Sequence, residues 1–322
     1  MNKIESTLDG LKQLLEYNLN DLLYSDKYKV VLSRHNNLIG YDVLNRMAIA
    51  CQNPKAVVLK TEEEWELEGR AIAIGAKPIY VFNPLYDIEY VDTSTGETLV
   101  HTDLTAEEKI LAMQFGMVEK HSNINEVAVI KTYELYDTCS VNGEEYKVNK
   151  PFMSMRELVE SFKKVTCARA LSTSEETNYN VETNILYVNE SESYIKFVHN
   201  ISLIWAQWLI DNRLKKNNGM TYDISIDDFN DKEYELLFNS LTYAISSMFG
   251  GKFNLDTRKN KDIQAEKIIS ILCIVDMLMV DVIYGTEFKV DNSKESAIDK
   301  AYRLKKTNII LNSMFVAYIQ NI

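Results

Sequence analysis

One helix-forming stretch in the second half of the chain carries a histidine where metal chemistry could begin. It reads His199-Asn200-Ile201-Ser202-Leu203. In the zinc-binding motif His-Glu-x-x-His, two histidines on one helix face ligate the metal, and the glutamate between them takes a proton from water. Asn200 cannot accept that proton and Leu203 cannot ligate a metal. A catalytic zinc ion usually has three protein ligands, so His199 is predicted to be a packed, hydrogen-bonded residue.

The remaining sequence contains no other catalytic pattern. It has no Walker loop, no GxGxxG and no GxSxG. The other three histidines are isolated, and the four cysteines are scattered without a CxxC pair. We therefore expect no catalytic residue, no metal and no cofactor.

The charge distribution separates one segment from the rest of the chain. The net charge is -12 at pH 7. Nucleic-acid-binding proteins concentrate lysine and arginine, because neutralising phosphates releases counterions, so this acidic excess argues against strong nonspecific binding. Residues 26–77 are less acidic than the rest of the chain, because they contain eight cations and seven anions. Five of these anions lie in residues 62–68. The cations are Lys27, Lys29, Arg34, Arg46, Lys55, Lys60, Arg70 and Lys77.

Hydrophobic spacing predicts a mixed α/β first half and a mostly helical second half. In the first half we expect helices at 3–24, 41–51 and 61–69, strands at 55–59, 71–74 and 79–82, and a strand pair over 126–137. After a boundary near Pro151 we expect helices at 154–165, 192–213, 231–249, 262–284 and 297–320, and a strand at 184–188. The pattern is that of an α+β chain with two domains, residues 1–150 and 151–322.

No segment reads as a signal peptide or a membrane span. The N-terminus is predicted to be a polar amphipathic helix. Residues 268–283 form the most apolar stretch, but it is too short to cross a bilayer and Asp276 and Asp281 interrupt it. These two aspartates are expected to face solvent or to pair locally. The sequence therefore predicts a cytoplasmic protein without a membrane partner.

The first half resembles a known DNA-binding domain. The resembling residues, in order, are Tyr41, Asn45, Gln52-Asn53-Pro54-x-Ala56, Trp65, Gly69-Arg70, Gly75-x-Lys77 and Pro84. They are similar to the N-terminal single-stranded-DNA-binding domain of ArdC-type antirestriction proteins and the related LtrC-like proteins of conjugative elements and phages. Two features depart from that family. Ala73 and Ile74 stand where lysines are common, and Pro78 stands where glycine is usual.

The second half resembles the zincin-like domain that follows in the same family. NILYV (184–188) and FVHNISLIWA (197–206) correspond to its strand and its HExxH helix, and NSLTYAISSMFG (239–250) to the helix of the third, acidic ligand. The resemblance covers roughly residues 5–285. It implies a degenerate zincin-like pseudo-metalloprotease domain. This chain differs from the family at three positions. Asn200 stands in place of the general base, Leu203 in place of the second histidine ligand, and Asn239 in place of the acidic ligand.

Several candidate DNA contacts also have a structural interpretation. Trp65 could stack on a base or anchor its helix against the sheet. Asn45 and Gln52, on one helix face, could bond bases or phosphates, or satisfy neighbouring backbone groups. Arg70 and Lys77 could bind phosphates or pair with the acidic run at 62–68.

The resemblance implies a non-catalytic antirestriction or anti-defence protein of a mobile element or phage, with single-stranded DNA as its partner. The alternative is an acidic protein–protein interaction module that engages a host protein without binding DNA. The DNA-binding candidates are Lys27, Lys29, Arg34, Asn45, Gln52, Lys55, Lys60, Trp65, Arg70 and Lys77.

Overall fold

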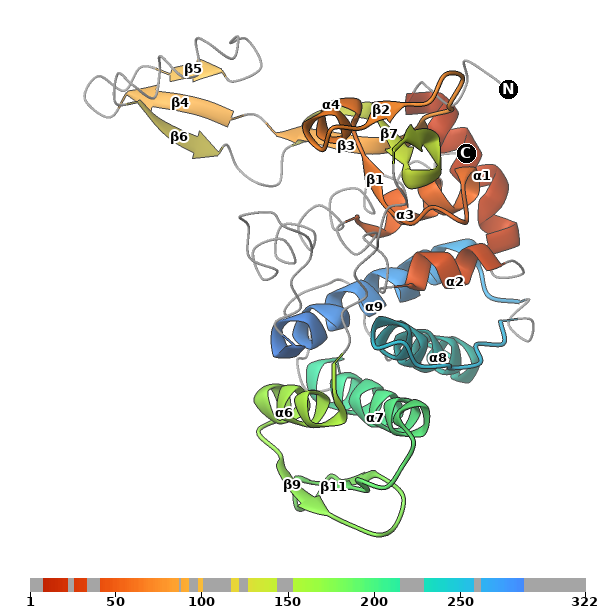
Figure 1. The fold of residues 1–322 in the computed structure, drawn as a ribbon, viewed down its shortest axis with the longest axis vertical. Helices are drawn as coiled ribbons and strands as arrows, with labels where there is room; N and C mark the ends of the chain where they lie inside the picture. The colour runs from red at the N-terminus through yellow and green to blue at the C-terminus, as the bar shows by residue number, and fades with distance from the viewer. Residues whose placement is uncertain are drawn as a thin grey trace.

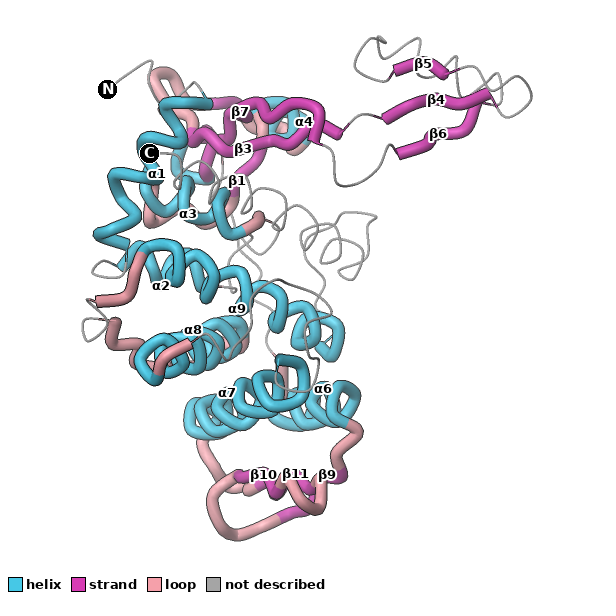
Figure 2. The backbone as a smooth tube through the Cα atoms, turned by 180° about the vertical axis from the view of Figure 1, so that it is seen from behind, coloured by secondary structure: helices cyan, strands magenta, loops and turns pink. Residues whose placement is uncertain are grey.

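The structure, a computed structural model, describes residues 8–22, 26–33, 41–86, 88–92, 98–100, 117–121, 127–143, 153–214, 229–257 and 262–286. Figures 1 and 2 show strands with short helices at one end, helices in the middle and a second small sheet at the other end. The fold is mixed α+β, as the sequence predicts. The division near Pro151 stays a prediction.

Strand β7 (Val127–Asp137) is the centre of the first sheet, which has the order β1-β7-β3. β1 (Leu59–Lys60) and β3 (Ile79–Tyr86) both run antiparallel to it. Leu59 pairs with Asp137 and Ile79 with Leu135. Strands β1 and β3 therefore both begin at the C-terminal end of β7, one on each side of it. The predicted strand pair over 126–137 is wrong. The segment alternates without a turn residue and therefore forms one continuous strand with a neighbour on each side.

The strand predicted at 55–59 is shorter than expected. Only Leu59 and Lys60 join the sheet. The backbone N–H groups of Val57 and Val58 instead donate to Oδ1 of the buried Asp137, at 2.9 and 3.1 Å. A carboxylate thus replaces the strand neighbour that these two groups would otherwise need.

The remaining strands form three small sheets. A 3₁₀ turn (Thr138–Ser140) leads from β7 into β8, which pairs with β2, and β4 lies between β5 and β6. At the opposite end of the molecule, β11 lies between antiparallel β10 and parallel β9. The bounds are β2 Ala71–Ile72, β4 Ile88–Asp92, β5 Thr98–Val100, β6 Met117–His121, β8 Val141–Asn142, β9 Arg169–Ser172, β10 Asn178–Asn180 and β11 Ile185–Val188.

Side-chain caps set the starts of several helices. Asp42 accepts the N–H of Asn45 at the start of α3, and Thr61, Ser154 and Asn230 form capping boxes at α4, α6 and α8. The helices are α1 Leu8–Leu22, α2 Asp26–Leu32, α3 Val43–Gln52, α4 Glu62–Leu67, α6 Met155–Thr166, α7 Tyr194–Leu209, α8 Asp231–Met248 and α9 Ala265–Thr286. A π-helical turn, Ile210–Leu214, follows α7. The predicted helix at 297–320 lies outside the described residues.

Within the described parts of the chain, no helix is long and apolar enough to cross a membrane.

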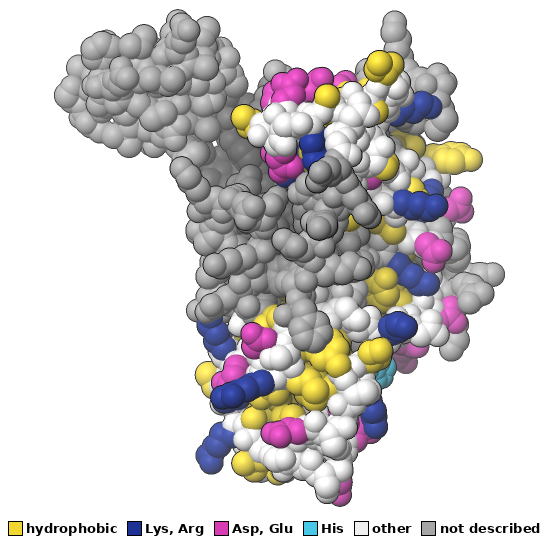
Figure 3. All heavy atoms as spheres, viewed as in Figure 1, with side chains coloured by type: hydrophobic (Ala, Val, Ile, Leu, Met, Phe, Trp, Pro, Cys, Tyr) yellow, Lys and Arg dark blue, Asp and Glu magenta, His cyan; other side chains and the backbone are white. Residues whose placement is uncertain are grey.

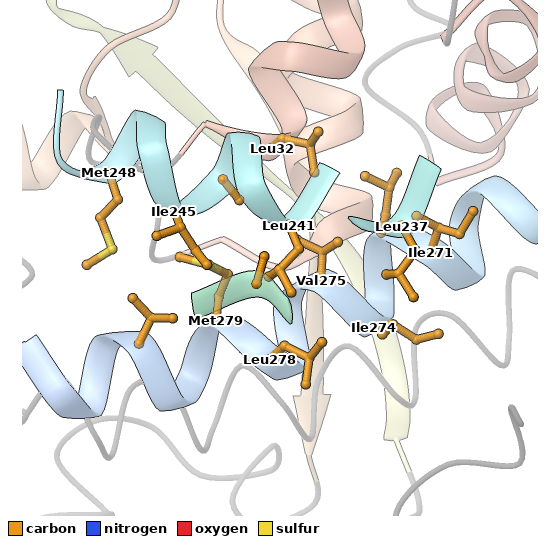
Figure 4. Close-up of a cluster of buried hydrophobic side chains, with 14 of the residues drawn as sticks. Leu32, Leu237, Leu241, Ile245, Met248, Ile271, Ile274, Val275, Leu278 and Met279 are labelled. Atoms are coloured by element: carbon orange, nitrogen blue, oxygen red, sulfur yellow. The ribbon is translucent and has the colours of Figure 1, made fainter. Parts of the chain in front are cut away.

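One buried apolar cluster contains residues from both sides of the predicted domain boundary. Figure 4 shows its centre, where Leu241 and Ile245 of α8 face Val275 and Met279 of α9. Leu32 of α2 belongs to the same cluster, together with residues of α1, α3, α6 and α7. The N-terminal helices therefore share their core with the C-terminal ones.

Two polar contacts also join the two halves inside this core. The hydroxyl groups of Tyr28 (α2) and Ser240 (α8) are 2.7 Å apart and buried. The guanidinium of Arg46 (α3), with 1% of its side chain exposed, pairs with Asp276 of α9. The expectation that Asp276 faces solvent or pairs locally is wrong, because its partner lies 230 positions earlier in the chain. Asp281 pairs with Arg213 near the surface.

We predict that Asp276→Ala lowers the free energy of unfolding by about 3–5 kcal/mol, because it leaves the Arg46 charge buried without its partner. Urea unfolding followed by circular dichroism measures the loss. Asp281→Ala is the matched control. Its pair with Arg213 is 31% and 42% exposed, so at most about 1 kcal/mol should be lost. Equal, small losses in both variants would contradict the assignment.

Candidate functional site

The helix that carries His199 is α7, in the part of the molecule that contains β9, β10 and β11 (Figure 1). The imidazole is partly buried and stacks on Phe253, with ring centroids 5.7 Å apart and planes inclined by 22°. His199 therefore packs against an aromatic ring, and the hydrogen bond expected for it stays a prediction.

Asn200 has a hydrogen-bonding role of its own. It is 8% exposed, and its side-chain amide donates to Glu192 and Glu176, each at 3.3 Å. Glu192 also accepts the backbone N–H of Thr177 at 3.1 Å and its hydroxyl at 2.9 Å. The asparagine therefore links α7 to the segment before β10. Lys196, 3.1 Å from Glu176, together with Asn200, keeps the pKa of the Glu176 carboxyl below its ordinary value.

Leu203, at the second ligand position of the motif, lines an apolar cavity of about 300 Å³. Asn239, at the acidic-ligand position, lies half-buried on α8. The cavity is lined by Tyr179, Val181, Leu203, Ile204, Gln207, Trp208, Asp211, Asn212 and Phe238.

These four positions do not fit a catalytic zinc ion. The set offers one imidazole, one leucine and two amides, whereas zinc takes thiolate, imidazole and carboxylate ligands. The amide of Asn200 is already used by two carboxylates. Nor is there, in the ranges that the structure describes, any group of three or more His, Cys, Asp or Glu residues able to hold a metal ion.

Four of the cations predicted to contact DNA belong to segments that lie near the same end of β7. Lys55 and Lys77 are exposed and precede β1 and β3, the two strands that begin there. Lys60 lies on β1, and Arg70 precedes β2, which pairs with β8 just beyond β7. We call Lys55, Lys60, Arg70 and Lys77 the basic edge.

Trp65 lies beneath two members of the basic edge. The Lys60 ammonium and the Arg70 guanidinium lie 5.3 and 6.0 Å from its ring centroid. The indole is fully buried, and its N–H donates to the carbonyl of Tyr136 at 2.8 Å. Trp65 therefore anchors α4 to the sheet. Of the two roles considered for it, base stacking and helix anchoring, the structure shows the second.

Asn45 and Gln52 also satisfy backbone groups of the fold. Asn45 accepts the N–H of Phe82 at 2.6 Å and donates to its carbonyl at 2.9 Å. Gln52 makes the same pair of bonds to Tyr80, at 2.9 and 2.8 Å. The two amides thus extend the hydrogen bonding of β3 onto α3. Of the two roles considered for them, contacts to DNA and bonds to neighbouring backbone groups, the structure shows the second.

The other predicted cations are not part of the basic edge. Lys27 and Lys29 lie on α2, which packs against α3 and α8, away from α4 and β2 in both views of the chain (Figures 1 and 2). Lys27 bonds to Asn18 of α1, and Lys29 pairs with Asp26. Arg34 lies outside the described residues.

Acidic side chains lie next to the basic edge. Helix α4 exposes Glu62, Glu63, Glu64 and Glu66, and Glu68 follows it and pairs with Lys60. Figure 3 shows acidic side chains gathered over α4. Lys60 pairs with this acidic run, whereas the sequence suggests such pairing for Arg70 and Lys77. The surface around α4 therefore carries a negative patch of glutamates next to the positive basic edge.

The chain is similar in structure to an antirestriction ArdC protein. No family model matches the chain, and no curated protein matches it in sequence. The metal-free crystal structure of ArdC from the R388 plasmid matches at 14% identity and a TM-score of 0.41, over 76% of this chain and 84% of that chain. The Mn(II)-bound structure matches at 12% identity and 0.46, over 86% and 97%.

Sequence reasoning missed the acidic residues that hold these parts in place. Glu192 is a turn residue before α7, and nothing in its neighbours indicates that Asn200 and Thr177 would meet on it. Asp42 could have been found, because it stands at a helix start. Burial, with a smaller contribution from Asp276, raises the pKa of Asp42 from 3.8 to about 6, although hydrogen bonds from Asn45 oppose the shift.

The raised pKa of Asp42 predicts a pH-dependent stability. The folded chain holds the Asp42 proton up to about pH 6 and the unfolded chain only to about 3.8, so the free energy of unfolding falls as pH rises through this window, by about 3 kcal/mol. We predict that Asp42→Asn removes this contribution. The difference in unfolding free energy between variant and wild type should therefore rise by that amount from pH 4 to pH 7.

Urea unfolding of both proteins at each pH measures this difference in unfolding free energy. Contributions from titrating groups that the two proteins share cancel in it. Asp26→Asn is the control. The Asp26 side chain is 91% exposed, so this variant makes the same substitution without the loss of a buried carboxyl. A flat difference for Asp42→Asn would show that the buried carboxyl does not titrate in this window.

Asn200→Glu, which introduces the glutamate of the His-Glu-x-x-His motif, is predicted to destabilise the fold. It replaces a donor with a third carboxylate beside Glu176 and Glu192, and the Glu192 side chain is only 4% exposed. We expect the free energy of unfolding to fall by about 3 kcal/mol at pH 7.5. The fall should be smaller at pH 5, because protonation of the introduced carboxyl relieves its repulsion by the two neighbouring carboxylates. Asn142→Glu, an exposed site on β8, should change stability by less than about 0.5 kcal/mol. An unchanged or more stable Asn200→Glu variant would disprove the proposed link.

Proposed function

We propose that this chain is a non-catalytic protein of the antirestriction type that binds single-stranded DNA through its basic edge. The observation behind the proposal is that Lys55, Lys60, Arg70 and Lys77 belong to segments near one end of the first sheet, where Lys60 and Arg70 share the Trp65 ring. The resemblance of residues 41–84 to the DNA-binding domain of ArdC-type proteins supports it, since the basic edge lies within that segment.

The size of the basic edge favours a single strand over a duplex. Four cations can neutralise only a few phosphates, and Lys60 is shared with Glu68. A net charge of -12 repels the dense phosphates of duplex DNA more strongly than those of one flexible strand. We therefore expect modest affinity that decreases steeply with salt.

The absence of catalysis is proposed from the chemistry of the helix α7 positions. Asn200 cannot act as a general base, and its amide is held by Glu192 and Glu176. Leu203 lines an apolar cavity and has no atom that ligates a metal. Stoichiometric zinc in the purified protein, measured by mass spectrometry, would overturn this part of the proposal.

The second candidate is an acidic interaction module that engages a host protein without DNA. The exposed glutamates of α4 favour it, because they form a negative helix face next to the basic edge. A pull-down that recovers nucleic acid but no specific protein would count against it.

Fluorescence anisotropy with a labelled single-stranded oligonucleotide, at salt from 50 to 200 mM, tests the DNA proposal. We expect the variant Lys55→Ala/Lys77→Ala to bind more weakly and to have a salt slope reduced by about 1.4, or roughly 0.7 for each phosphate that is no longer neutralised. The control is Arg169→Ala/Lys252→Ala, which removes two exposed cations elsewhere in the chain. No binding of the wild type at micromolar protein and low salt would rule out DNA binding.

A further inference from the structure

The turn after β2 presents an apolar side chain to solvent. Ile74 is fully exposed, at 104% of the reference area. A buried isoleucine stabilises a fold through the hydrophobic effect, and the exposed Ile74 makes no such contribution. Its side chain is therefore available to a ligand.

The backbone holds this turn in a defined conformation. The N–H of Ala76 donates to the carbonyl of Ala73 at 2.9 Å, and the N–H of Ala73 donates to Ser140 at 2.9 Å. Gly75 adopts φ +81°, a left-handed conformation that an L side chain rarely takes. Ile74 thus stands at the tip of a turn tied to the end of β7, so little conformational entropy would be lost when it contacts a ligand.

Members of the basic edge flank Ile74 on both sides in the chain. Arg70 lies four positions before it, against Gly143 of the segment after β8, and the exposed Lys77 lies three positions after it. Leu67, 88% exposed at the end of α4, is a second apolar side chain in the same region, because α4 packs against β2. Cations around an apolar tip match a strand of nucleic acid, which has anionic phosphates and bases with apolar faces.

We propose that Ile74 packs against an unstacked base of bound single-stranded DNA, while Arg70 and Lys77 contact the phosphates on either side. This inference rests on the proposed DNA binding and adds a base contact to it. Aliphatic side chains insert between bases in other DNA-binding proteins, and a single strand requires less unstacking than a duplex. The contact distinguishes bases from the bare sugar–phosphate chain.

The test compares two probes of equal length, an oligothymidylate and an oligonucleotide with abasic sites, by fluorescence anisotropy over a salt series. We expect the wild type to bind the thymidylate about tenfold more tightly than the abasic probe. Ile74→Ala should bind both probes equally, with an unchanged salt slope, because phosphate contacts set that slope. Ile74→Leu should keep the preference.

Leu171→Ala is the control, since Leu171 is 50% exposed on β9 at the opposite end of the molecule (Figure 1). It should bind as the wild type does. If Ile74→Ala keeps the full preference for thymidylate, the base contact is disproved while DNA binding stands. If the wild type binds neither probe, the proposed function fails, and this inference fails with it.

Discussion

The guanidinium of Arg46 is almost completely removed from water and faces the carboxylate of Asp276 across the contact between α3 and α9. An isolated charge in this position would cost several kcal/mol, so the two helices can pack here only when both partners are present. The contact lies in the same core as Leu32, Leu241 and Val275. Packing of the N-terminal helices against the C-terminal ones therefore depends on a paired charge as well as on apolar surface.

Elements with local signals were predictable from the sequence. Helices α3, α6 and α8 begin at Asp42, Ser154 and Asn230, each a residue type that caps helices, and their apolar spacing has a helical period. Strand β1 was not predictable in its length, because Asp137, eighty positions away from Val57, takes the hydrogen bonds of the preceding residues. The mixed α+β class followed from these local patterns, whereas the partner of Asp276 depended on a contact between distant segments.

The candidate sites divide in the same way. Residue types alone excluded zinc chemistry at Asn200 and Leu203, since an amide and an alkyl group lack the required atoms. Residue types could not decide whether Asn45, Gln52 and Trp65 serve a ligand or the fold. The structure shows their polar atoms bonded to the backbone of β3 and β7. Lys55 and Lys77 are exposed instead, and they precede two strands, β1 and β3, that begin at the same end of β7 on either side of it.

The hydrogen bonds of Asn200 oppose a change of helix α7 toward the His-Glu-x-x-His motif. Its amide is bonded to Glu176 and Glu192, so a glutamate introduced there alone would first weaken the fold that must carry it. A histidine at 203 would remove part of the apolar lining of the cavity before any metal could offset that change. The side chain of Ile74, by contrast, is fully exposed and can be replaced without disturbing the core. A new ligand preference could therefore arise at this position by a single substitution.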